Sequence, residues 1–194
     1  MAQLQHIALP ALWETIGREK VADYGIFTLW RVRRRHPLRQ QTGEFVVLEA
    51  PTWVNIVPIT SEGEIVLIEQ YRHGLDALTL EIPGGMVIPG EDPRIAAERE
   101  CREETGYASD EPAILLSTNY PNPAFLTNVC YSYLWRGCRR VTGTLWDRHE
   151  EIAVRLYPAR DALQLIRDGH IRHALVLVAL FSALSTDITS MLQT

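Results

Sequence analysis

The first third of the chain is dominated by short apolar runs with strand character. Four segments between residues 25 and 70 are rich in β-branched and aromatic residues, which is typical of β-strands. Turn signals such as QTG and SEG separate them. The four segments are GIFTLWRVRRR, EFVVLEA, WVNIVPIT and EIVLIEQ, and together they predict an antiparallel meander.

The rest of the chain adds three strand candidates and a helical C-terminal part. The further strand candidates are AILLST, CYSYLW and EIAVRLY. Pro158 can open a helix through ARDALQLIRDG and Gly169 is its stop signal, while IRHALVLVALFSAL predicts a second, largely buried helix. No internal repeat or low-complexity linker interrupts residues 1–194, so we expect one α+β domain.

A third helix is predicted in the middle of the chain by its end signals. Asp92 can cap the helix, and Pro93 suits the first helical position because its missing N–H has no helical partner to lose. Gly106 is the matching stop signal. Ala97 and Cys101 lie four residues apart and begin a small apolar face.

Three carboxylates share another face of this predicted helix. Glu100, Glu103 and Glu104 are three and four residues apart, and such like charges repel by about 0.2–0.5 kcal/mol per pair. Arg99 can pair with Glu103 at i,i+4 spacing. Either this is a solvated helix face, or the carboxylates hold a hard cation such as Mg2+ or Mn2+ beside the Gly-Gly turn at residues 84–85.

Charge and composition narrow the class of partner. The net charge of −5 argues against a dedicated nucleic-acid binder, because such proteins need a basic surface for phosphates. An anionic substrate would therefore need a local source of positive charge. Arg31, Arg33 and Arg35 alternate onto one face of a predicted strand, which indicates a solvated edge strand or, alternatively, a phosphate contact.

Cysteine usage and hydropathy predict a cytoplasmic protein without a membrane span. The three cysteines contain no CxxC pair and their number is odd, so neither a zinc site nor a disulfide framework is indicated. The N-terminus lacks a basic segment followed by an apolar run. ALVLVALFSAL is about half the length of a membrane-spanning helix.

A spaced motif runs through the acidic helix and decides between the two interpretations of its glutamates. Seven fixed letters of this kind recur by chance about once in 10⁸ windows. The motif is Gly85, five residues, Glu91, seven residues, Arg99-Glu100, apolar Cys101, one residue, Glu103-Glu104, one residue, Gly106 and apolar Tyr107. The sequence therefore resembles the Nudix hydrolases, and the solvated face is the weaker interpretation.

The resemblance implies a fold and a reaction. Nudix hydrolases cleave a nucleoside diphosphate linked to another group with the help of divalent metal, on an α/β/α sandwich around a mixed β-sheet. The flanking segments WVNIVPITSEGEIVLIEQYRHGLDALTLEIPGGMV and NYPNPAFLTN look like the ADP-ribose and nucleoside-diphosphate-sugar pyrophosphatase branch, from about Trp53 to the C-terminal helix. In that branch an N-terminal β arm, here residues 1–50, often crosses to a partner subunit, so the resemblance implies a homodimer with residues 51–194 as the Nudix core.

Site residues follow from the same resemblance, position by position. The Gly84 carbonyl, Glu100 and Glu104 are implied to hold metal with help from Glu103. Arg72 and Glu81 are implied to contact substrate, and the motif is supported by Gly85, Glu91, Arg99 and Gly106. An acid of the DRHEE segment is implied to deprotonate water, with Glu150 or Glu151 preferred over Asp147. Glu103 is a further candidate for this base. Trp53 or Phe125 can stack on a base, or belong to the core.

One loop leaves the substrate open. Residues 121–128, PNPAFLTN, replace the Ser-Pro-Gly type turn with a following acid that many ADP-ribose enzymes carry. A nucleotide sugar with another base therefore competes with ADP-ribose. The remaining alternatives are a sensor that binds nucleotide sugar without cleaving it and an RNA-cap pyrophosphatase that uses the basic residues 31–39.

Overall fold

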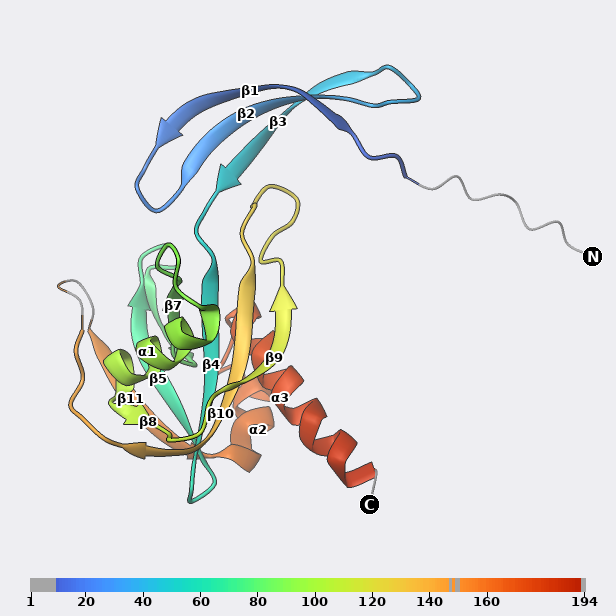
Figure 1. Ribbon diagram of the computed structural model, residues 1–194. Helices are drawn as coiled ribbons and strands as arrows, with labels where there is room; N and C mark the ends of the chain where they lie inside the picture. Colours follow the sequence, from blue (N-terminus) through green and yellow to red (C-terminus); the bar gives the residue numbers. More distant parts are fainter. Residues whose placement is uncertain (1–9, 147, 149–150, 193–194) are drawn as a thin grey trace, which may run out of the picture. The chain divides into compact units, whose positions relative to one another are not determined.

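The structure is a computed structural model that describes residues 10–146, 148 and 151–192. Over these residues the strands form one three-stranded and one eight-stranded sheet. The chain divides into two compact units: Met1–Ala50 with Asn122–Thr127, and Pro51–Pro121 with Asn128–Thr194. We describe each unit by itself (Figure 1).

The smaller sheet belongs to the first unit and is antiparallel throughout. Its strands are β1 (Glu14–Asp23), β2 (Thr28–Arg35) and β3 (Thr42–Glu49), with β2 in the centre. The sequence prediction missed β1, because ETIGREKVAD is mostly polar and its residues are mostly exposed. Its pairing with β2 supplies the order that the local pattern lacks.

The prediction that Arg31, Arg33 and Arg35 lie on an edge strand was wrong. They lie on β2, which pairs with a neighbour on each side. Arg31 donates a hydrogen bond to Glu19 at 3.1 Å and Arg35 donates one to Glu14 at 2.7 Å. Glu19 and Glu14 of β1 lie across from Arg31 and Arg35, so cross-strand pairs neutralise these two arginines, whereas Arg33 lies across from Gly17.

The larger sheet is mixed. Its main path is β11-β5-β4-β10-β8, with β6 on β5, β7 on β4 and β9 on β10. Strands β4 and β10 run parallel, and the other pairs are antiparallel. The strands are β4 (Trp53–Thr60), β5 (Glu64–Arg72), β6 (Ala77–Glu81), β7 (Gly84–Met86), β8 (Tyr107–Ala108), β9 (Ile114–Asn119), β10 (Cys130–Arg140) and β11 (Ile152–Pro158).

A four-strand meander over residues 25–70 does not form. β3 pairs with β2 in the smaller sheet, whereas β4 joins the larger sheet between β5 and β10. The reason is burial: five of the eight residues of β4 are buried, and this near-continuous apolar run requires cover on both faces. The meander prediction holds only for the hairpins β2–β3 and β4–β5.

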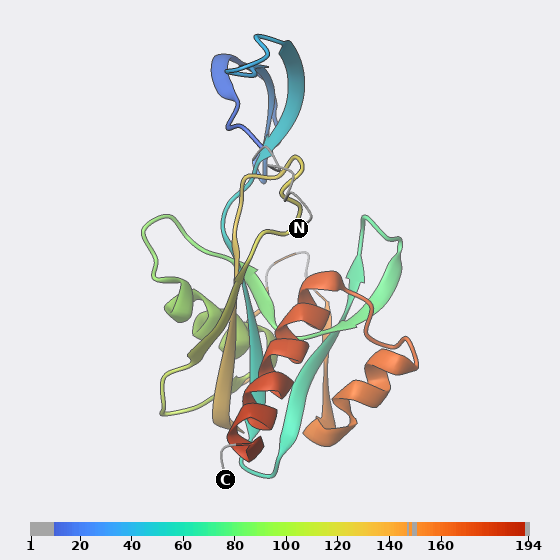
Figure 2. The same ribbon diagram turned by 90° about the vertical axis from the view of Figure 1, so that its right-hand side faces the viewer.

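Helices cover both faces of the larger sheet (Figure 2). On one face, Ala97 and Cys101 of α1 (Pro93–Thr105) pack with Val54 and Ile56 of β4. On the other face, α3 (Ala174–Leu192) packs with Val57, the next residue of β4, through a set of small and branched side chains: Val176, Ala179, Leu180 and Ala183. Strand alternation thus builds two cores. The predicted α/β/α sandwich around a mixed sheet is confirmed.

The C-terminal helices follow the predicted signals with one correction. A single 3₁₀ turn, η1 (Ala159–Asp161), leads into α2 (Ala162–Arg167), and Gly169 follows in the left-handed conformation with φ 74°. α3 is buried on one side only, since Phe181 is 71% exposed. In the described part of the chain, no helix combines the length and apolar character that a membrane span requires.

Candidate active site

The motif helix α1 begins and ends at the predicted residues. The Asp92 carboxylate accepts hydrogen bonds from the backbone N–H groups of Arg94 at 2.8 Å and Ile95 at 3.4 Å. Pro93 is the first helical residue, and Gly106 ends the helix in the left-handed conformation with φ 76°. Its N–H donates to the carbonyl of Arg102. Local capping chemistry therefore sets the length of the helix.

Two of the helix carboxylates lie against the glycine strand β7. The buried side chain of Glu104 accepts a hydrogen bond from the Gly84 N–H at 2.9 Å. A Cβ atom on Gly85 would lie 2.4 Å from Cδ of Glu100, so the Glu100 carboxylate fills the space beside this glycine. The carboxylates of Glu100 and Glu104 therefore lie beside the peptide groups of residues 84–85.

Arg99 connects the acidic residues of the motif. Its guanidinium donates to both oxygens of Glu91 at 2.9 and 3.1 Å, and to one oxygen each of Glu100 and Glu103 at 2.9 Å. It also donates to the Met86 carbonyl at 3.2 Å. The predicted pair of Arg99 with Glu103 is therefore present, within a larger network. Arg99 offsets much of the repulsion between the glutamates.

Electrostatics agree with this network. The hydrogen bond to Glu91 raises the pKa of Arg99 above its ordinary value; the charge of Glu100 and the hydrogen bonds to Glu103 and Glu100 act in the same direction, against the effect of burial. The hydrogen bond from Arg99 likewise lowers the pKa of Glu91. The loop that carries Glu91 and the helix that carries Arg99 are joined by an ion pair of two parallel hydrogen bonds.

The donor chemistry of this region fits a hard divalent cation. Carboxylate and carbonyl oxygens are the ligands that Mg2+ and Mn2+ prefer, and the carboxylates of Glu100 and Glu104 lie against the peptides of residues 84–85. Among the described residues, no three His, Cys, Asp or Glu side chains already converge as a metal-binding group. Arg99 holds oxygens of Glu100 and Glu103, so a bound cation would share these carboxylates with it.

Arg72 and Glu81 form an ion pair on the hairpin of β5 and β6. Two parallel hydrogen bonds of 2.9 and 2.7 Å join the guanidinium to the carboxylate. Burial alone would raise the pKa of Glu81, but the hydrogen bonds from Arg72 and Thr79 outweigh it and hold the pKa below its ordinary value. The Arg72 side chain is 44% exposed and that of Glu81 is 2% exposed, so the arginine is the solvent-facing member of the pair.

The remaining predicted residues occupy separate places. Trp53 is half-buried at the start of β4 in the larger unit, and Phe125 is exposed in the smaller unit. Glu151 is exposed directly before β11, while Asp147 and Glu150 lie outside the described residues. The roles predicted for these residues stay predictions.

Sequence reasoning missed Thr79. Its hydroxyl donates to the Glu81 carboxylate at 2.6 Å. The signal was present, because residues i and i+2 of a strand point to the same face, so TLE in a strand places Thr79 beside Glu81. The Met86 carbonyl, which accepts from Arg99, had no comparable signal because the contact spans thirteen residues.

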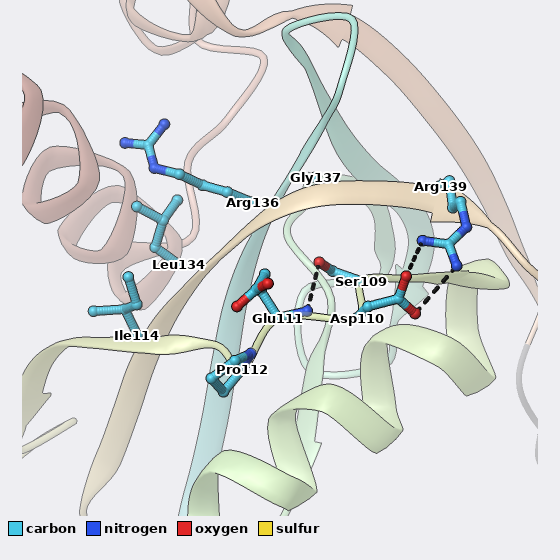
Figure 3. Close-up of a pocket in the computed structure, with 9 residues that line it drawn as sticks. All are labelled: Ser109, Asp110, Glu111, Pro112, Ile114, Leu134, Arg136, Gly137 and Arg139. Atoms are coloured by element: carbon cyan, nitrogen blue, oxygen red, sulfur yellow. Dashed lines mark hydrogen bonds and ion pairs between the residues drawn. The ribbon is translucent and has the colours of Figure 1, made fainter.

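A cavity of about 600 Å³ lies elsewhere in the larger unit, between β10 and the segment from β8 to β9. Arg139 pairs with Asp110 at 2.9 and 3.1 Å. Figure 3 shows this pair and Arg136, which points away from it. The Glu111 N–H donates to Ser109 Oγ at 3.2 Å. None of the predicted site residues lines the cavity. The motif, rather than this cavity, marks the candidate active site.

Comparison with known proteins agrees with the motif. The family model "NUDIX domain" matches residues 50–179. The chain is 32% identical to the methanol dehydrogenase activator of Bacillus methanolicus over 140 residues. The matched segment covers 72% of this chain and 75% of that protein. It is 30% identical over 176 residues to the ADP-ribose pyrophosphatase of Mycobacterium tuberculosis, with 88% of this chain and 82% of that protein covered.

A solved structure has the same fold. It is the crystal structure of an ADP compounds hydrolase, with a TM-score of 0.79 and 23% identity over 89% of this chain and 92% of that one. The chain belongs to the Nudix family and is a Nudix hydrolase. The resemblance to the ADP-ribose pyrophosphatase branch is confirmed. Members of the family generally use divalent metal ions.

Proposed function

We propose that the chain hydrolyses the pyrophosphate bond of ADP-ribose or a related nucleoside diphosphate sugar in the presence of Mg2+, with Mn2+ as the alternative metal. The products are a nucleoside monophosphate and a sugar phosphate. The observation that carries the proposal is the placement of the Glu100 and Glu104 carboxylates against the Gly84–Gly85 strand, inside an intact motif. The substrate class is supported by the relative from Mycobacterium tuberculosis.

In this proposal Glu100, Glu104 and the Gly84 carbonyl hold the metal, and Glu103 assists. When bound, the metal neutralises diphosphate charge and makes water a better nucleophile at neutral pH. Gly85 leaves room for the Glu100 carboxylate, and the ion pair of Glu91 with Arg99 holds the loop before α1. Gly106 ends the helix directly after the turn that carries Glu103 and Glu104.

The proton of the attacking water passes to a carboxylate. We favour Glu150 or Glu151, with Glu103 as the alternative. One oxygen of Glu103 accepts a hydrogen bond from Arg99 at 2.9 Å, and this ties the side chain to the motif network. Glu151 is exposed and precedes β11, so it is reachable from solvent.

Arg72 supplies the positive charge that an acidic chain needs for a diphosphate. Its side chain is 44% exposed at the end of β5. Arginine suits this role because its planar fork matches phosphate oxygens. Trp53 or Phe125 would stack on the base. Alanine variants of the two aromatic residues, tested for a rise in KM, would identify the one that does.

The decisive assay measures product release from ADP-ribose, GDP-mannose and UDP-glucose with and without Mg2+. Glu104→Gln keeps an oxygen for the Gly84 N–H but removes the charge, so we expect it to lose at least about 1000-fold in kcat. Glu62→Gln, in an exposed turn, is the matched control. Full activity of Glu104→Gln would contradict the metal assignment. Tight binding of a nucleotide sugar without turnover by the wild-type protein would instead support a sensor.

A homodimer and a cytoplasmic location complete the proposal. The smaller sheet exposes large apolar side chains on strands β1 and β3, among them Val21, Phe45 and Val46. Phe45 and Val46 point to opposite faces of β3, and a second copy packed on the face that carries Val46 would cover part of this apolar surface. Light scattering should give twice the mass of 22.1 kDa, and Val46→Asp should reduce it. A monomeric mass for the wild-type protein would contradict the dimer. The three reduced, buried cysteines fit a cytoplasmic location.

A further inference from the structure

The Glu81 carboxylate is buried and already engaged within the protein. It is 2% exposed, and both oxygens already accept hydrogen bonds. Oε1 accepts from Arg72 Nε at 2.9 Å and from the Thr79 hydroxyl at 2.6 Å, and Oε2 accepts from Arg72 Nη2 at 2.7 Å. The contacts of Glu81 with Arg72 and Thr79 suit it to hold the arginine in place.

Thr79 fixes the orientation of the Glu81 carboxylate. The two residues lie on the same face of β6, two positions apart. The Thr79 hydroxyl has one proton, and its contact with the charged Glu81 at 2.6 Å is shorter than the 3.4 Å to the Gln70 carbonyl. A hydrogen bond to a carboxylate is also the stronger of the two. The hydrogen bond from Thr79 thus favours one orientation of the Glu81 carboxylate toward the Arg72 guanidinium.

The hairpin backbone holds the arginine from the other side. Arg72 pairs with Ala77 in the register of β5 and β6, and Glu81 pairs with Ile68. The Arg72 carbonyl accepts hydrogen bonds from the N–H groups of Leu75 at 3.0 Å and Asp76 at 2.9 Å. These bonds fix the backbone of Arg72, and the contacts with Glu81 fix its side chain. Without Glu81 the long side chain would sample many rotamers, and this freedom would be lost on binding.

We propose that Thr79 and Glu81 are positioning residues, which form a clamp that presents the Arg72 guanidinium to the diphosphate of the substrate. The clamp rests on the proposed function, because that function makes Arg72 the diphosphate contact. Glu81 acts through Arg72, and Thr79 acts through Glu81. When the Thr79 hydroxyl is lost, Arg72 is still present, but its side chain samples more rotamers.

Kinetics of Thr79→Val and Thr79→Ser test the clamp. Arg72 contacts charge that the substrate already carries, so its disorder should raise KM about 5- to 10-fold and change kcat less than 2-fold. Thr79→Ser keeps the hydroxyl and should restore the wild-type KM. Thr118→Val, an exposed threonine on β9, is the matched control. The substrate is the nucleotide sugar of the panel with the highest kcat/KM in the presence of Mg2+.

A double-mutant cycle separates positioning from general destabilisation. Arg72→Ala should raise KM more than Thr79→Val does, and Thr79→Val should add nothing in the Arg72→Ala background. The KM of Glu81→Gln should approach that of Arg72→Ala, because a carboxamide has one acceptor oxygen and an NH2 group where the carboxylate has two acceptor oxygens. Equal KM values for Thr79→Val and wild type, or additive effects in the cycle, would overturn the proposal.

One measurement does not depend on turnover. The Arg72 Nε–H, identified in NMR spectra by its loss in Arg72→Lys, should exchange slowly with solvent in the wild-type protein because it is bonded to Glu81. Thr79→Val should speed this exchange at least 5-fold. Faster exchange in a protein that cleaves none of the panel would support the clamp and reject the proposed function. Unchanged exchange would overturn the clamp even if the hydrolysis is found.

Discussion

The carboxylate of Glu100 lies in the space that a side chain at Gly85 would occupy. A Cβ atom there would come within 2.4 Å of Cδ and 2.5 Å of Oε1 of Glu100. Backbone on β7 and side chain on α1 therefore fit together only because residue 85 is glycine. The constraint is steric and has no φ requirement, since Gly85 is not among the glycines with positive φ.

Gly85→Ala should consequently displace the Glu100 carboxylate. A shift of about 1 Å at a catalytic group costs roughly 100-fold in rate, so we expect kcat/KM to fall about 100-fold while the protein stays folded. Circular dichroism and the Mg2+-dependent shift in Tm would be measured beside activity. Gly143→Ala is the control, because a Cβ atom at that exposed glycine meets nothing within 4 Å. Unchanged activity in Gly85→Ala would remove Glu100 from the site.

The ends of α1 were predictable because their chemistry is local. Asp92 and Pro93 start the helix and Gly106 ends it, all through contacts within a few residues. The i,i+4 pair of Arg99 with Glu103 was predictable for the same reason. The spaced motif then identified the family from seven letters, whatever the fold around them.

Contacts between distant segments were not predictable in the same way. Arg99 also reaches Glu91 and the Met86 carbonyl, because the loop before α1 turns back toward the helix. Strand β1 is too polar to be recognised without its partner, and β4 was placed beside β3 in the predicted meander although it lies between β5 and β10. Strand pairing depends on which faces can be covered at once, and a local pattern cannot specify this.

Arg99→Ala should destabilise the protein. The side chain is 25% exposed and its ionic hydrogen bonds hold Glu91, Glu100 and Glu103, whose mutual repulsion would then be uncompensated. We expect a loss of about 2 kcal/mol in the free energy of unfolding, measured by urea titration without metal. Arg94→Ala breaks an i,i+4 pair on the same helix and should cost about 0.5 kcal/mol or less. Equal losses in the two variants would contradict the network.

The three cysteine thiols should be unreactive in the folded protein. Cys101, Cys130 and Cys138 are fully buried. Burial raises the pKa of Cys130 and of Cys138 from 9.0 to about 12, so the thiolate fraction near neutral pH falls about 1000-fold. A colorimetric thiol reagent at pH 8 should find no thiol in native protein and three in urea. Thr118→Cys should add one fast-reacting thiol, and rapid labelling of the wild-type protein would disprove the burial.

Glu81 should contribute stability that acid removes. Its pKa in the folded protein lies below the ordinary value of 4.5, because the effects of Arg72, Thr79 and the nearby charge of His173 exceed that of burial. The unfolded state therefore binds the proton more readily than the native state. The contribution is fully present above about pH 5 and is lost as pH falls through the lower, folded pKa. The difference in unfolding free energy between wild type and Glu81→Gln, measured by urea titration from pH 7 to pH 3, should stay constant to about pH 5 and then shrink. Glu62→Gln, exposed in a turn, should show no such trend, and a difference for Glu81→Gln that grows toward acid would reverse the sign of the assigned pKa shift.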